Sequence, residues 1–168
     1  LSAELEREIA AVAQRQPAWE RAVLEAVKTA EVHPLEIREF KSSGGSSSKI
    51  LPDRSVRVSG KSPGKDTYTV TIDTQLTDIT GFKIEALTDS SLEQKGPGRG
   101  DRPNFVLNEV IVTAGPAGDA GTEAKKLSTH SAAAGFSQKN WDVKGAFDGN
   151  PKTGWAIAPQ FGKPHFAT

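Results

Sequence analysis

The sequence predicts a mainly β protein: an antiparallel β-sandwich or barrel in residues 32–168, preceded by a helical arm or linker in residues 1–30. From Val32 onward, apolar and polar side chains alternate with a period of two in several short segments, as in strands with one wet face. Turns rich in glycine, proline and serine separate these segments, and no helical period lies between them. Short strands without crossover helices favour antiparallel pairing.

The arm shows the spacing of an amphipathic helix from residue 2 to about 15, and the same period restarts from about residue 19 to 29. Pro17 lacks an N–H group and suits a first helical turn, so we predict two helices that are interrupted at this proline. The arm is interpreted as a spacer that packs its apolar stripe on the domain or on missing sequence. The stripe comprises Leu5, Ile9, Val12, Ala13, Trp19, Val23, Ala26 and Val27.

Four segments are predicted to be strands. In "DTYTVTIDT", Tyr68, Val70 and Ile72 share one face, opposite a face of threonines and Asp73. This alternation predicts one wet side and one covered side. The other predicted strands are "SVRVSG", "GFKIEAL" and "NFVLNEVIVTA", and the predicted turns are "SSGGSSSK", "SGKSPGK" and "EQKGPGRGDRP". "TAGPAGDAGTEAK" is either a long surface loop or a boundary.

Composition excludes several functions. Lysine plus arginine and aspartate plus glutamate both number 21, so no net charge favours nucleic acid or an anionic surface. No cysteine is present, which excludes disulfides and thiolate metal sites, and no apolar run is long enough to insert into a membrane. Because the chain starts at Leu1 and contains no methionine, we expect it to be part of a longer protein with room for a signal sequence upstream.

Several apparent motifs fail on inspection. Gly60-Lys61-Ser62 lacks the first glycine of a phosphate loop, and the tripeptide Arg99-Gly100-Asp101 is explained by its turn-rich surroundings. The three histidines lack metal-site spacing, and no GxSxG elbow is present, so we do not expect an enzyme. Asp142 and Asp148 could pair as acid and base in a glycosidase, which is the least favoured of the hypotheses.

Glu109 interrupts the apolar segment "NFVLNEVIV". If Phe105, Leu107 and Ile111 face the core, strict alternation sends Glu109 inward, and with the opposite phase Asn108 points inward instead. A buried carboxylate without a partner would cost several kcal/mol or stay protonated, so it needs a cation or a cluster of donors. The alternatives are a bulge that returns Glu109 to solvent and a salt bridge to a lysine.

The stretch "AFDGNPKTGWAI" predicts a tight turn in which oxygen atoms converge. Asp148 contributes a carboxylate, and Thr153 adds a hydroxyl and a carbonyl within one further turn. Closely spaced hard oxygens suit calcium, although the frame of an EF-hand is absent. One carboxylate binds calcium poorly, so Glu109 is the candidate second acid, and Trp155 is expected to anchor the loop in the core.

"AFDGNPKTGW" resembles the A-x-D-G-x-x-x-T-x-W signature of discoidin-type, galactose-binding-like jelly-roll domains, which include coagulation-factor C domains and several carbohydrate-binding modules. "ITGFKIEAL" and "FVLNEVIVTA" resemble the closing strands of that fold, where an acid joins the aspartate and threonine around a structural calcium. The resemblance implies that Asp148, the Asn150 backbone, Thr153 and Glu109 bind the metal. In that family the aspartate loop precedes the acid, whereas here Glu109 comes first; a circular permutation would preserve the site.

A longer set of segments resembles a region of the large exported planctomycete proteins that combine a cytochrome-c-like haem domain with planctomycete-specific domains of unknown function. The segments are "QPAWE", "DTYTVTIDT", "ITGFKIEALTDSSL", "GPGR", "NFVLNEVIVTA", "FSQ" and "TGWAIAPQFGKPH". The resemblance implies an extracytoplasmic location, periplasmic or secreted, and haem attachment outside this segment. Further strands follow in that family, so we expect the sandwich to be incomplete, completed by a partner chain, or truncated at its C-terminus.

These observations give a leading hypothesis and an alternative. The first is a non-catalytic module, stabilised by calcium, that attaches a larger protein to a glycan or another cell-surface ligand; Trp141, Phe161 and His165 flank the loop and are the candidate ligand-binding residues. Hydrophobic packing is the competing role for Trp141 and Phe161. The alternative is a purely structural or interaction domain that positions the neighbouring domains of the parent protein.

Overall fold

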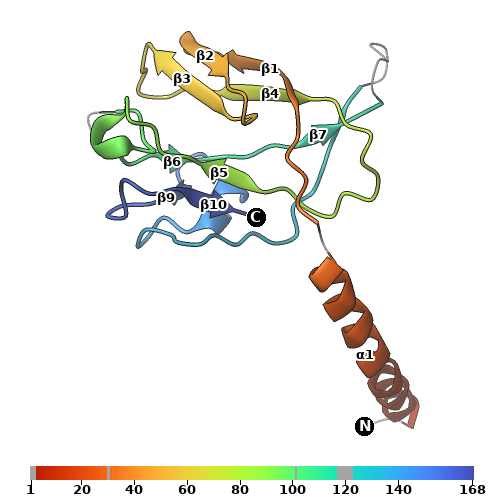
Figure 1. Cartoon of the computed structure of the whole chain (residues 1–168). Helices are drawn as coiled ribbons and strands as arrows, with labels where there is room; N and C mark the ends of the chain where they lie inside the picture. The colour runs from red at the N-terminus through yellow and green to blue at the C-terminus, as the bar shows by residue number, and fades with distance from the viewer. Residues whose placement is uncertain (1–2, 30, 101, 117–122) are drawn as a thin grey trace. The chain divides into compact units, whose positions relative to one another are not determined.

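The computed structural model describes residues 3–29, 31–100, 102–116 and 123–168 (Figure 1). Its internal contacts divide the chain into two units, Leu1–Pro34 and Leu35–Thr168. The described part of the first unit contains one helix, and the strands belong to the second unit. The chain is therefore mainly β, as predicted.

Helix α1 (Ala3–Thr29) continues through Pro17, so the prediction of two helices is wrong. A proline inside a helix costs about 3 kcal/mol relative to alanine, but the flanking residues are mostly good helix formers such as alanine, glutamate and arginine. The Gln16 amide also donates a hydrogen bond to the Glu20 carboxylate at 2.7 Å, across the turn that follows the proline. Among the described residues, no helix has the length and apolarity that crossing a membrane requires.

The second unit consists of short strands and two 3-10 turns. The strands are β1 (Ile37–Ser42), β2 (Ser46–Ile50), β3 (Val56–Gly60), β4 (Tyr68–Ile72), β5 (Ile84–Ala86), β6 (Val106–Leu107), β7 (Thr113–Ala114), β8 (Lys125–Lys126), β9 (Trp155–Ala156) and β10 (His165–Ala167); the turns are η1 (Glu93–Lys95) and η2 (Val143–Ala146). The predicted strand "NFVLNEVIVTA" is thus divided between β6 and β7.

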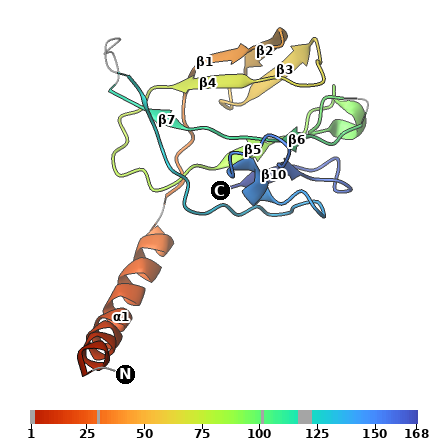
Figure 2. The ribbon, with the colours of Figure 1, turned by 180° about the vertical axis from the view of Figure 1, so that it is seen from behind.

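The strands pair antiparallel, as predicted, and the pairs are β1–β4, β2–β3, β5–β10, β6–β9 and β7–β8. Figures 1 and 2 both show β1 to β4 on one side of this unit and β5, β6 and β10 on the other, and Figure 1 shows β9 with the second group. In the described residues the pairs remain two-stranded and do not join into two continuous sheets. The segment predicted to be a loop or a boundary contributes β7 and the first residue of β8, and its residues 117–122 lie outside the described residues.

Strand β4 keeps the predicted alternation, but its apolar face is not covered. Tyr68, Val70 and Ile72 are 44%, 45% and 37% exposed. Their partners on β1 include Phe40, whose ring centroid lies 5.1 Å from that of Tyr68. The two-residue period decides which side chains share a face. Whether another element covers that face depends on the rest of the fold, which the period does not specify.

Strand β2 begins at Ser46, inside a serine- and glycine-rich stretch that was predicted to be only a turn. The Asp66 carboxylate explains this difference, because it accepts hydrogen bonds from the hydroxyls of Ser42, Ser43 and Ser46, at 2.6, 3.2 and 3.0 Å, and from the Gly44 N–H at 2.7 Å. These bonds, the one from Ser42 above all, lower the pKa of Asp66 to about 2. The carboxylate therefore fixes the turn and lets the serines continue as a strand.

Arg99 connects the loop that follows η1 to the first four strands. Its guanidinium donates hydrogen bonds to the hydroxyls of Tyr68 and Ser46, at 2.8 and 3.1 Å, and to the carbonyl of Lys61 at 3.0 Å. The arginine of the Arg99-Gly100-Asp101 tripeptide is therefore engaged within the molecule, while Asp101 lies outside the described residues.

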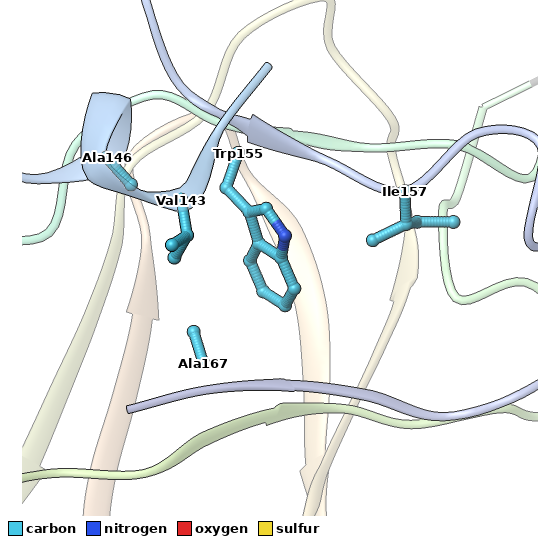
Figure 3. Close-up of a cluster of buried hydrophobic side chains, with 5 residues drawn as sticks. All are labelled: Val143, Ala146, Trp155, Ile157 and Ala167. Carbon is cyan, nitrogen blue, oxygen red and sulfur yellow. The ribbon is translucent and has the colours of Figure 1, made fainter. Parts of the chain in front are cut away.

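The buried core is small and lies around β9, β10 and η2 (Figure 3). Trp155 and Ile157 are fully buried, and Val143, Ala146 and Ala167 lie beside them. The Trp155 ring meets the Phe105 ring edge-on at 5.2 Å, and its Nε1 donates a hydrogen bond to the Phe136 carbonyl at 2.8 Å. The prediction that Trp155 anchors the preceding loop in the core is confirmed. The side chains packed around this core are Phe105, Leu107, Val110, Ala132, Ala134, Phe136, Phe147 and Phe161.

Candidate metal site

The structure places the segment that contains Glu109 alongside the loop that contains Asp148. Strand β6 pairs with β9 directly after this loop, with Leu107 opposite Trp155. Three residues beyond β6, the Val110 N–H donates a hydrogen bond to the carbonyl of Ala146, the first residue of the loop, at 2.8 Å. Both ends of residues 146–155 are thus tied to residues 107–110.

Asn108 ties the middle of the same loop. Its Nδ2 donates hydrogen bonds to the carbonyl oxygens of Thr153 and Pro151, at 2.8 and 3.2 Å. Loop carbonyls that are held in this way keep their orientation, because a side-chain amide can serve two acceptors at once. Asn108 is therefore a positioning residue for the loop.

The oxygen atoms of the loop converge on the Thr153 hydroxyl. Thr153 Oγ1 lies 2.7 Å from the Asn150 carbonyl, 2.9 Å from each carboxylate oxygen of Asp148 and 3.2 Å from the Gly145 carbonyl. A hydroxyl carries one proton and cannot satisfy four acceptors together. Two backbone donors serve two of these acceptors: the Asn150 N–H donates to Asp148 Oδ1 at 2.8 Å and the Thr153 N–H to the Asn150 carbonyl at 3.1 Å, which leaves Asp148 Oδ2 and the Gly145 carbonyl to share the hydroxyl among the bonds described. This surplus of acceptors is the environment that a cation would neutralise.

The strand alternation changes phase next to this loop. Phe105 and Leu107 pack against the core, and the next core residue is Val110, three positions later, while Ile111 is 63% exposed. Neither phase predicted by strict alternation therefore holds across Asn108 and Glu109. The break resembles a bulge, which was one of the alternatives, but it leaves the Glu109 side chain only partly exposed.

Glu109 Oε1 is buried and has no hydrogen-bond partner among the described residues. Glu109 lines a hollow of about 360 Å³ together with Phe147 and Gly149, the two neighbours of Asp148 in the loop. Buried carboxylate oxygens are normally satisfied, so this atom is a position at which a cation would bind. The second acid proposed from the sequence is thus placed beside the loop of the first.

The donor set fits calcium better than a transition metal. It consists of carboxylate, hydroxyl and carbonyl oxygens, which are the ligands that calcium takes in irregular numbers and geometry. Asn150 contributes its backbone carbonyl, while its side-chain oxygen accepts a hydrogen bond from the Lys152 N–H at 3.1 Å. In the described parts of the chain, no three acidic or histidine side chains gather, so a site here would depend on the loop carbonyls.

The three candidate ligand-binding residues are placed differently. His165 is 5% exposed, and its Nε2 donates a hydrogen bond to the Gln160 carbonyl at 2.6 Å, so it offers no surface to a ligand. Phe161 packs against the core, which is the competing role considered for it. Trp141 is partly exposed and caps a tight turn, with its N–H donating to the Gln138 carbonyl at 2.9 Å. A shared binding surface of these three side chains is not formed.

Two contributors to the site have little signal in the sequence. Gly145 adds a carbonyl because it lies against the loop, where a Cβ would come within 2.7 Å of the Gly154 nitrogen. Lys126 lines the same hollow as Glu109, although it follows a long turn-rich segment. Neither position belongs to a motif, and only the pairing of β7 with β8 brings Lys126 to this place.

Comparisons with protein-family models, with curated proteins and with solved structures find no match to this chain.

Proposed function

We propose that residues 35–168 form a galactose-binding-like β-sandwich, stabilised by calcium, that binds carbohydrate as a non-catalytic module of a larger extracytoplasmic protein. One observation carries the proposal: four acceptor oxygens converge on the Thr153 hydroxyl, beside the buried and unpartnered Glu109 Oε1. Both features are explained by one hard cation. The resemblance of the loop to discoidin-type domains supports the same assignment.

The arrangement of the strands supports the sandwich. The antiparallel pairs lie in two groups, and the buried core packs against the second of them (Figure 1). Glu109 precedes Asp148 in the chain and yet lies beside its loop, which is what a circularly permuted jelly roll would require. The exposed apolar face of β4 corresponds to a position where further strands or a partner would complete the sandwich.

Calcium removal tests the metal site. A ligand that binds only the folded state stabilises it by RT ln(1 + [L]/Kd), about 2.7 kcal/mol at a hundredfold excess over Kd. We expect calcium to raise the midpoint of thermal unfolding by several degrees relative to chelator, and Glu109→Gln and Asp148→Asn to abolish this shift. Differential scanning calorimetry measures both.

Asp142→Asn is the matched control. Asp142 is an acid near the same loop, but its Oδ1 accepts a hydrogen bond from the Lys144 N–H at 3.0 Å and caps η2. This variant should be less stable with and without calcium and should keep the full calcium shift. If the midpoint of thermal unfolding of the wild type is the same in calcium and in chelator, the proposed calcium site is wrong.

Carbohydrate binding is supported by the likeness of the loop at residues 146–155 to the signature of carbohydrate-binding modules. We expect the protein, loaded with calcium, to be retarded on affinity gels that contain at least one polysaccharide from a panel of neutral and acidic polymers. Unchanged mobility on every gel would leave only the structural role for this module.

A further inference from the structure

The hollow beside Glu109 is built from three segments of the second unit. Glu109 lines it from the segment after β6, residues 126–129 from β8 and the segment after it, and Phe147 and Gly149 from the metal-site loop. Backbone hydrogen bonds fix these walls: Leu127 N–H donates to the Val112 carbonyl at 2.9 Å, and Val110 N–H donates to the Ala146 carbonyl at 2.8 Å. Its volume of about 360 Å³ lies within the range of small-ligand sites.

Lys126 gives the hollow a positive charge. Its exposed ammonium forms no ion pair or hydrogen bond with the residues that the structure describes. Its neighbour Lys125 does not line the hollow, because adjacent residues of a strand point to opposite faces. The ammonium of Lys126 is therefore available to pair with an anionic group of a ligand.

The remaining lining suits a polyhydroxylated ring. The hydroxyls of Ser128 and Thr129 each donate and accept, and neither is bonded within the described chain. Phe147, a partly buried aromatic residue that packs against the core, also lines the hollow. Aromatic rings support the apolar C–H face of a sugar, while hydroxyls recognise its edge.

Glu109 decides what charge such a ligand can carry. With Glu109 ionised and unneutralised, its carboxylate would repel an anion that approaches Lys126. A cation on Glu109 removes this repulsion and leaves Lys126 as the dominant charge of the hollow. The inference below therefore rests on the proposed calcium site.

We propose that the hollow binds a uronic-acid residue of an acidic polysaccharide. The sugar carboxylate pairs with the Lys126 ammonium, and its hydroxyls meet Ser128 and Thr129. Calcium at Glu109 neutralises the carboxylate that would otherwise repel an anion. Binding of the acidic sugar to the hollow therefore depends on calcium.

Isothermal titration calorimetry of the whole chain with methyl glucuronide tests this inference, with methyl glucoside and the uncharged methyl glucuronamide as reference ligands. In calcium, we expect glucuronide to bind about tenfold more tightly than either neutral sugar, because only glucuronide forms the ion pair. Lys126→Met should remove this preference, and Lys125→Met, the neighbouring control, should keep it. Thermal unfolding of each variant establishes that it is folded.

The results separate this inference from the calcium site. If calcium raises the unfolding midpoint but glucuronide binds no better than glucuronamide, the uronate assignment is overturned and the metal site stands. An unchanged glucuronide preference in Lys126→Met overturns it as well. If calcium leaves the midpoint unchanged and glucuronide binds equally in chelator, the role given to the cation fails. Binding that requires calcium, prefers glucuronide and is lost only in Lys126→Met supports the whole assignment.

Discussion

Gly154, in the loop of the candidate metal site, has no room for a larger side chain. Its φ is +154°, and an added Cβ would come within 2.7 Å of the Leu107 carbonyl oxygen and 2.9 Å of the Asn108 Cα. These are backbone atoms of the neighbouring segment, so they cannot move aside as a flexible side chain would. The close approach of the loop to β6, which aligns Asn108 with the loop carbonyls, depends on this glycine.

Gly154→Ala should therefore lower the free energy of unfolding by about 2–4 kcal/mol, the sum of backbone strain and overpacking. Gly149→Ala is the control, because Gly149 has a φ of +76° but open space around its missing Cβ. It should lose only about 1–2 kcal/mol, the cost of a left-handed conformation. Urea unfolding at constant m-value measures both losses. Equal losses would mean that the contact with Leu107 is not tight.

The site residues could be proposed from the sequence because Asp148 and Thr153 lie close together in one turn. The phase of Glu109 could not, since strict alternation allows only two orientations and the chain adopts a third. A slip of one residue between Leu107 and Val110 is invisible in the pattern, because apolar side chains flank Asn108 and Glu109 in both phases. The place of Lys126 could not be predicted either, because it lines the hollow only as a result of the pairing of β7 with β8.

At the level of elements, the turn between β1 and β2 depends on one carboxylate. The pKa of Asp66 is lowered from 3.8 to about 2 in the folded chain, first by the Ser42 hydroxyl and then by the other donors of the turn. A carboxyl group with a depressed pKa stabilises the fold above its unfolded pKa. That stability is lost as the pH falls through the folded value.

Asp66→Asn should consequently be less stable than the wild type well above pH 3.8, and the difference should shrink as the pH falls toward about 2. Ser42→Ala removes the strongest donor and leaves the carboxyl group in place. The stability of this variant should therefore depend less on pH between about 2 and 3.8 than that of the wild type. Denaturant midpoints across this pH range provide the measurement. Parallel curves for Asp66→Asn and the wild type would contradict a role for the charged carboxylate.

Elements with a clear period were predicted better than their ends. Residues 56–60, 68–72 and 84–86 are strands, as the alternation indicated. The local preferences of proline and serine predicted a helix break at Pro17 and a turn in place of β2. In both cases other interactions outweigh these preferences. For α1 these are the helix-forming residues on both sides of the proline, and for β2 they are the hydrogen bonds to Asp66.

For the whole molecule, the sequence predicted the mainly β class and the antiparallel pairing, but not how the strands group. The period of two says nothing about which strand pairs with which, and several partners lie far apart in the chain, as β5 does from β10. It also does not reveal that large apolar side chains such as Val70 stay 45% exposed. Such coverage depends on contacts between distant elements, and local patterns do not encode them.

Arg99 also restricts which substitutions the molecule can accept. Its planar guanidinium donates to three acceptors at once, the hydroxyls of Tyr68 and Ser46 and the carbonyl of Lys61. Lysine would keep the charge, but its compact ammonium cannot span these acceptors with the same rigid geometry. Arg99→Lys would be a neutral change in most surface loops, but here it would weaken the attachment of the loop to β2, β4 and the segment after β3. This position is therefore constrained by shape rather than by charge.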